Sequence, residues 1–143
     1  MALRGKYTLK RPEKYLGNPK SVIYRSKWER ETFKFLEGNP QVVKWASEEI
    51  KIPYLDPWNK PHRYYPDLYF ELGNGKKYLV EIKPASQCRP PTTSNHRRFI
   101  KEQIRYQINQ NKWSAAKDWC ARHGLEWRVW TERDLNKTLG LKI

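Results

Sequence analysis

The sequence predicts one domain of the α/β (α+β) class, in which helices flank a mixed β-sheet. Two alternating segments within residues 62–83 meet at Gly73-Asn74-Gly75, as the strands of a β-hairpin do. A long helical pattern from about His96 to His123 follows, and the short apolar segment LEWRVWT comes after it. A helix between strands can return the last strand parallel to the hairpin, which gives a mixed sheet.

Length and charge narrow the class of protein. The chain has 143 residues, enough for one compact domain. Its 29 Lys and Arg against 15 Asp and Glu give a formal charge of +14, which favours a polyanionic partner, nucleic acid first. Seven Trp and nine Tyr argue against disorder. We therefore expect a folded protein that binds nucleic acid.

Several other classes are disfavoured. No apolar segment approaches the roughly 20 residues of a membrane span, and the first residues lack the apolar core of a signal peptide. Cys88 and Cys120 have no metal-site spacing to the histidines and are expected to be free thiols. We therefore expect an intracellular protein.

The N-terminal segment is predicted to be a basic arm. Residues 1–20 hold six Lys or Arg and one acidic residue, and Pro12, Gly17 and Pro19 interrupt any periodicity. The expected division is an arm over residues 1–24, which adds nothing to the core, and a folded domain over 25–143.

The remaining elements follow in chain order. An apolar stripe ending at Gly38-Asn39-Pro40 predicts a helix over about 27–37. Extended segments are expected over 41–54. Loops are expected over 55–61 and 84–95, both rich in proline. The helical pattern over 96–123 is one helix or two, with a possible break near 109–111, and Thr131 with Asp134 predicts the cap of a terminal helix.

Two carboxylates lie at mirrored distances from the hairpin turn. Asp67 is six residues before Gly73, and Glu81 is six residues after Gly75. A three-residue turn sets their side chains opposite each other on one face, with Cβ atoms about 5 Å apart. A two-residue turn would put them on opposite faces. Because side chains alternate along a strand, Lys83 shares the face of Glu81.

Opposed carboxylates repel each other unless a cation or a proton lies between them. Carboxylate oxygens with water and phosphate are usual ligands of Mg²⁺, and Mn²⁺ is expected to substitute for it. Lys83 would then orient the attacking water or stabilise charge on a phosphate. The alternative is a solvated surface pair of Glu81 and Lys83, worth less than about 1 kcal/mol.

Pro66-Asp67 followed by Glu81-Ile82-Lys83 resembles the core motif of PD-(D/E)xK nucleases. The segments YRSKWERE, VVKWASEEIKIPY, HRYYPDLYF, YLVEIKP and HGLEWRVWTERDL, taken in order, resemble the head-completion nucleases of T-even-like tailed phages and, more distantly, TnsA-type transposon endonucleases. The resemblance runs from about Gly5 to the C-terminus. It implies a restriction-endonuclease-like core and a nuclease active site formed by Asp67, Glu81 and Lys83.

The resemblance also implies that an acidic residue on the first helix completes the metal site, and the matching residue is Glu29. Ser26-x-x-Glu29 is equally the pattern of a helix capping box, which is the competing role. TnsA-type enzymes often have glutamine where this chain has Glu81. The expected catalytic set is Glu29, Asp67, Glu81 and Lys83, of which Glu29, Asp67 and Glu81 would be metal ligands.

Basic residues around the motif are the expected contacts to DNA phosphates. They are Arg25, Arg63, Arg89, Arg97, Arg98, Lys101 and Arg105. No known base-reading motif is present, so weak or structure-based selectivity is expected. Four tryptophans could stack on bases, but their periodicity places them in the core: they are Trp113, Trp119, Trp127 and Trp130.

The resulting hypothesis is a magnesium-dependent deoxyribonuclease that hydrolyses phosphodiesters of double-stranded DNA. The resemblance implies action at DNA ends after packaging, during phage head completion, with portal or neck proteins as partners. Two alternatives stay open. One is a non-catalytic virion protein that binds DNA, and the other is a TnsA-like or repair endonuclease whose specificity comes from a partner protein.

Overall fold

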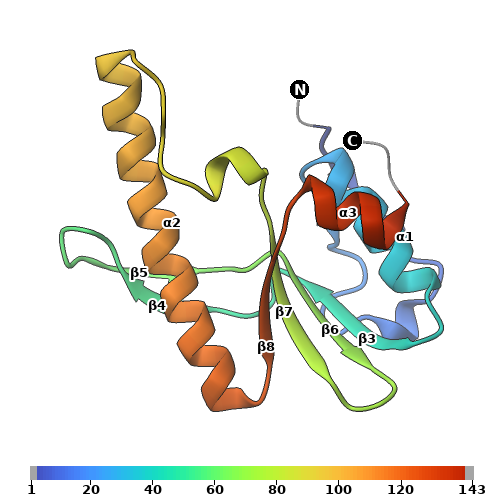
Figure 1. The fold of residues 1–143 in the computed structure, drawn as a ribbon. Coiled ribbons are helices and arrows are strands. Elements are labelled where there is room, and N and C mark those ends of the chain that lie inside the picture. The colour runs from blue at the N-terminus through green and yellow to red at the C-terminus, as the bar shows by residue number, and fades with distance from the viewer. Residues whose placement is uncertain (1–2, 141–143) are drawn as a thin grey trace.

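A four-stranded mixed sheet forms the centre of the protein (Figure 1). The computed structural model describes residues 3–140. The first two residues of the predicted arm and the last three of the predicted domain, 141–143, lie outside the described residues. The strands, in spatial order, are β3 (Val42–Ser47), β6 (Leu68–Leu72), β7 (Lys77–Ile82) and β8 (Glu126–Trp130). Only β8 is parallel to its neighbour, and helix α2 (His96–His123) makes the crossover. The predicted class is confirmed.

Helices cover both faces of the sheet (Figure 1). Helix α1 (Lys27–Gly38) packs Phe33 and Leu36 against Trp45 and Val80, and α3 (Glu132–Leu139) lies beside α1. The other face carries Leu79, on which the C-terminal half of α2 packs through its apolar side chains. The four tryptophans predicted to be in the core are partly buried and pack against these two clusters.

Helix boundaries agree with the sequence signals. Helix α1 covers the predicted range, and α2 is one unbroken helix. At the start of α2, the Asn95 side chain accepts a hydrogen bond from the Arg98 amide. At its end, Gly124 has a φ of +74° and stops the helix in the left-handed conformation. Thr131 and Asp134 form the predicted capping box of α3. The loop 84–95 contains one short 3₁₀ helix, η2 (Ala85–Gln87).

One predicted strand is divided in two. Strand β5 (Pro61–Tyr64) pairs with β4 (Ile52–Leu55) in a separate antiparallel hairpin, and the central sheet resumes only at Leu68. The reading of residues 62–83 as just two strands is therefore wrong at its start. Pro66, which is fully buried, has no N–H to donate to a sheet ladder, so the strand is interrupted there.

The N-terminal segment is part of the folded body. Strand β1 (Gly5–Lys6) pairs with β2 (Ile23–Tyr24), and the 3₁₀ helix η1 (Pro12–Lys14) lies between them. Three side chains of this segment are buried in the core, and these are Tyr7, Tyr15 and Val22. The prediction that residues 1–24 add nothing to the core is wrong, because isolated apolar residues without periodicity gave no signal. The boundary at residue 25 stays a prediction.

Candidate active site

The hairpin of β6 and β7 brings Asp67 and Glu81 together. Leu72 N donates to Lys76 O across a loop of Gly73, Asn74 and Gly75, which is the three-residue turn that the spacing required. The register pairs Leu68 with Val80, and one step further it sets Asp67 opposite Glu81. The amide of Ile82 donates a 2.7 Å hydrogen bond to Asp67 Oδ2, which fixes this carboxylate against β7.

Glu81 is held by two partners on the face of the sheet that α2 covers. Only 7% of Glu81 is exposed. The Tyr64 hydroxyl donates a 2.6 Å hydrogen bond to Glu81 Oε1, and Lys83 Nζ lies 3.5 Å from Oε2. Burial and the negative charge of Glu81 raise the pKa of Tyr64 far above its ordinary value, so this hydroxyl remains a donor.

Glu29 combines a helix cap with a place near the carboxylates. Its amide donates to Ser26 Oγ, as in a capping box, but its own Oε1 accepts from the Arg25 amide and not from Ser26. Burial raises the pKa of Glu29, and the charges of Glu48 and Glu81 add to the effect. The capping bond and proximity to the acidic cluster therefore coexist, although the sequence had presented them as competing roles.

Glu48 is a fourth carboxylate, which sequence reasoning missed. It follows β3, and its φ of +53° is strained for a residue with a side chain. Its amide donates to the Asp67 carbonyl at 3.2 Å, and its side chain forms an ion pair with Arg25. The available signal was an acidic pair, Glu48-Glu49, directly after an apolar strand. The positive φ that directs it has no sequence signature.

The four carboxylates act on one another electrostatically. Burial raises the pKa of Asp67 well above its ordinary value, and the charges of Glu81 and then Glu29 raise it further. Burial likewise raises the pKa of Glu48, with Glu81 adding and Arg25 opposing. With all groups ionised, four negative charges face two positive ones, Arg25 and Lys83. The fully ionised cluster would therefore carry an excess of two negative charges, and the raised pKa values reflect the cost of that excess.

This charge and the hard oxygen donors suit a divalent cation such as Mg²⁺. As the side chains stand, no three His, Cys, Asp or Glu residues within 3–140 converge closely enough to hold a metal ion. Glu81 is turned toward Tyr64 and Lys83, and Asp67 toward the Ile82 amide. The assignment of Glu29, Asp67 and Glu81 as metal ligands stays a prediction.

The predicted DNA contacts fall into three places. Arg25 is paired with Glu48 at the cluster, and Arg63 is exposed on β5. Arg89 is exposed in the loop after β7. The first turns of α2, which stand clear of the sheet in Figure 1, carry the other four, all exposed: Arg97, Arg98, Lys101 and Arg105.

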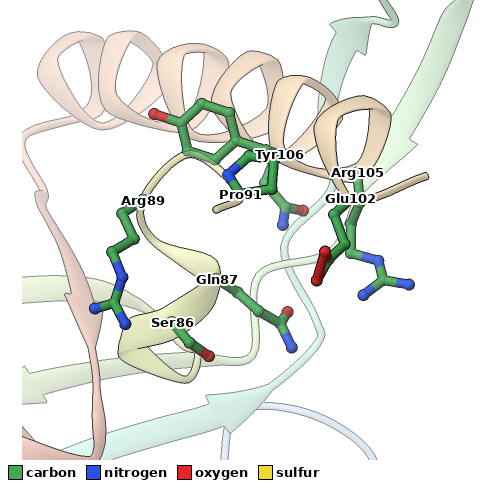
Figure 2. A pocket seen from close by; sticks show the side chains of 8 residues that line it. Ser86, Gln87, Arg89, Pro91, Glu102, Arg105 and Tyr106 are labelled. Atoms are coloured by element: carbon green, nitrogen blue, oxygen red, sulfur yellow. The ribbon is translucent and has the colours of Figure 1, made fainter. Parts of the chain in front are cut away.

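A polar pocket separates this part of α2 from the loop 84–95. Its volume is about 580 Å³, and Arg89, Arg98 and Arg105 line it. Figure 2 shows the smaller adjoining pocket, where Arg105 and Glu102 come from the helix and Arg89 from the loop. Glu102 is 3.6 Å from Arg98 and reduces the local positive charge. Their role as phosphate contacts stays a prediction.

Comparisons with known proteins give two findings. The model of the family described as "TnsA-like endonuclease N terminal" matches residues 39–132, a range that includes Glu48, Asp67, Glu81 and Lys83 but not Glu29. The chain is 36% identical over 149 aligned residues to the head completion nuclease of Enterobacteria phage T4, with 99% of each chain covered. Within the described residues, no helix is long and apolar enough to cross a membrane.

Proposed function

Since the chain belongs to the TnsA-like endonuclease family and is a nuclease, we propose that it hydrolyses DNA phosphodiesters at the Asp67–Glu81 cluster. The observation that carries the assignment is the pairing across the β6–β7 hairpin. It sets two carboxylates opposite each other, with Lys83 3.5 Å from one of them. A structural role alone gives no reason to hold repelling charges together.

In this proposal Mg²⁺ is the cofactor, and Mn²⁺ replaces it. Asp67, Glu81 and Glu29 would hold the ion. Glu48 interacts electrostatically with Glu29 and Glu81, so its negative charge would also attract the ion. Bound magnesium supplies Lewis-acid activation of water and neutralisation of phosphate charge. The excess of two negative charges that the ionised cluster would carry supports a dication as its partner.

Lys83 has the role of orienting the attacking water or stabilising charge on the phosphate. Its side chain is 23% exposed, so a substrate can reach the ammonium group, and Glu81 holds that group at the carboxylates. A fixed cation beside the phosphate stabilises charge that grows in the transition state. Arg63, Arg89 and the basic first turns of α2 would hold the flanking DNA phosphates.

The biological setting is proposed from the relative. The T4 protein is named a head completion nuclease, and the likeness covers 99% of both chains. We propose the same setting here, with action on ends of double-stranded DNA after packaging, in the host cytoplasm or the virion. Portal or neck proteins are the proposed partners.

Digestion of plasmid and linear DNA with Mg²⁺ or Mn²⁺ tests the activity. Wild-type protein is expected to cut, and Asp67→Asn is expected to lower the rate at least 100-fold while remaining folded. Glu71→Gln is the matched control, because Glu71 lies on the same hairpin but pairs with Lys77 at the turn end. Wild-type protein as inert as Asp67→Asn on every substrate and metal would refute the proposal.

A further inference from the structure

The tip of the β4–β5 hairpin presents an exposed tryptophan. Trp58 is 61% exposed, the highest value for a large apolar side chain among residues 3–140, and Leu55 beside it is 53% exposed. The two strands join at residues 56–60, which project beyond α2 on the left of Figure 1. An indole ring left in water forgoes about 2 kcal/mol of burial free energy, which a ligand that covers the ring would supply.

Hydrogen bonds order the backbone of this tip, from which the Trp58 ring projects. Asp56 organises it: Oδ1 accepts hydrogen bonds from the amides of Trp58 and Lys60, at 2.8 and 2.9 Å. His62 Nε2 lies 2.7 Å from Asp56 Oδ2, and the Asn59 amide donates to the Asp56 carbonyl. The turn is closed by the Asp56 amide, which donates to the Lys60 carbonyl. Because the backbone of the turn is already ordered, binding at the tip costs little backbone entropy.

The hairpin is tied to α2 at two places, the tip end of β4 and Tyr64. Asn111 Nδ2 donates a 3.0 Å hydrogen bond to the Leu55 carbonyl, and the Lys112 ammonium lies 5.9 Å from the ring centre of Tyr54 and 5.6 Å from that of Tyr64. These contacts fix the direction in which the hairpin projects.

The same strand leads from the tip to the carboxylate cluster. Tyr64, the last residue of β5, donates to Glu81, and Asp67 follows three residues later. Trp58 is six residues before Tyr64, which at about 3.3 Å per residue is no more than about 20 Å. That upper limit corresponds to at most about six nucleotides at about 3.4 Å each.

The charge around the tip fits a polyanion. Lys60 and Arg63 are exposed, and neither has a carboxylate partner within the described residues. The acidic residue of the tip, Asp56, is engaged by backbone amides and His62, so it does not present a free carboxylate toward a ligand. An apolar ring flanked by cations matches nucleic acid, in which stacked bases alternate with phosphates.

We propose that Trp58 stacks on a nucleobase of the DNA substrate, within about six nucleotides of the bond that is cut. The inference rests on the proposed nuclease function and refines its substrate. Base faces are hidden inside an intact duplex, so a stacking ring selects a terminal base pair or an unpaired strand. The hairpin thus favours DNA ends or single-stranded overhangs over closed duplex.

Binding is measured in the Asp67→Asn background with a chelator, so that no cleavage occurs. Labelled DNA is offered as an overhang-bearing end, a blunt end and a closed minicircle. Trp58→Ala is expected to weaken binding to the overhang about 5- to 100-fold, whereas Trp58→Phe keeps most of the affinity. In Trp58→Ala the slope of log affinity against log salt concentration is expected to stay constant, because stacking releases no counterions. In Arg63→Ala the magnitude of this slope is expected to fall by about 0.9, because one phosphate contact is lost.

Leu55→Ala is the matched control, because it removes another exposed apolar side chain from the same tip without removing a ring. A second readout places 2-aminopurine along the strand, and quenching is expected to peak within about six nucleotides of the cut and to disappear in Trp58→Ala. Unchanged DNA affinity in a normally melting Trp58→Ala protein would overturn the inference. So would equal losses of DNA affinity for Trp58→Ala and Leu55→Ala, which would show that the aromatic ring itself does not carry the binding.

Cleavage by the otherwise wild-type chain separates this inference from the nuclease proposal. Cutting that does not depend on Trp58 contradicts only the role of the hairpin. Binding that depends on Trp58, in a chain that never cuts, supports the stacking and contradicts only the nuclease function.

Discussion

The Tyr64 hydroxyl donates a 2.6 Å hydrogen bond to Glu81 Oε1, and so joins two sheets that share no strand pairing. Tyr64 belongs to the β4–β5 hairpin and Glu81 to the central sheet, so this bond, together with the packing of the Tyr64 ring on Leu79 and Trp127, couples the hairpin to the carboxylate cluster. Tyr64 therefore has the position of a residue that orients Glu81, and it lies on the path from the hairpin tip to the cluster.

Tyr64→Phe removes this bond and leaves the ring in place. We expect activity to fall about 10-fold, and the Mg²⁺ concentration for half-maximal activity to rise, because Glu81 loses the group that orients it. A metal titration of the cleavage rate measures both. Tyr65→Phe, at the exposed neighbouring position, is the control and should match wild type. A lower rate with an unchanged metal requirement would contradict the positioning role.

Glu48→Gln tests the carboxylate that the sequence did not reveal. Glu48 adds negative charge to the cluster and pairs with Arg25, so we expect a 10- to 100-fold loss of cleavage with the fold retained. Glu49→Gln changes the adjacent, exposed carboxylate and should leave the rate within about 2-fold. Initial cleavage rates of the two variants are measured under saturating Mg²⁺. Equal rates would show that Glu48 is not part of the active site.

The sequence predicted those parts of the site whose residues are close to one another along the chain. The opposition of Asp67 and Glu81 follows from a turn length and the two-residue period of strands, and both are visible in 62–83. Glu48 reaches the cluster only because β3 pairs with β6 and the backbone then takes a positive φ. That placement depends on tertiary packing, which no local pattern encodes.

The N-terminal segment shows the same limit for the fold. Its core residues, Tyr7, Tyr15 and Val22, are too far apart to form a periodic stripe, and six basic residues surround them. What secures the segment is Glu37, a buried carboxylate at the end of α1. Its Oε1 accepts from the Tyr7 hydroxyl at 2.9 Å, and its Oε2 from the Lys10 and Arg11 amides at 2.6 and 2.8 Å. A contact between residues 26 to 30 apart leaves no trace in a local sequence window.

Glu37→Ala is expected to destabilise the protein by about 3 kcal/mol, because three buried or half-buried donors lose their acceptor. For a domain of this size that is a fall of roughly 10 °C in Tm. Thermal melting measures it, with Glu31→Ala, a carboxylate on the same helix paired only with surface cations, as control. Equal melting of the two variants would contradict the anchoring role of Glu37.

Tyr7 gives the fold an alkaline limit. Burial, and then the hydrogen bond to Glu37, raise the pKa of Tyr7 above its ordinary value. A raised pKa in the folded state means that the stabilisation is complete below about pH 10 and is lost as pH rises above it. Tyr7→Phe should therefore melt below wild type at pH 8, and the difference should narrow above about pH 10. Melting curves between pH 7 and 11 test this, and a difference that widens with pH would contradict it.

Asp67→Asn is expected to make the protein more stable while abolishing cleavage. Without a metal, the buried Asp67 carboxylate is held against Glu81 and close to Glu29, and this repulsion costs folding free energy. An asparagine oxygen can still accept from the Ile82 amide, so the substitution removes charge and keeps the bond. We expect a gain of about 1 kcal/mol in the free energy of unfolding, or roughly 3 °C in Tm.

Added Mg²⁺ or Ca²⁺ should raise the Tm of wild type and leave that of Asp67→Asn nearly unchanged, because the divalent cation relieves a repulsion that only wild type has. Glu71→Gln should behave as wild type in both conditions, since Glu71 pairs with Lys77 away from the cluster. A loss of stability in Asp67→Asn, or an equal response of both proteins to the metal, would show that charge repulsion at this hairpin is not what a cation relieves.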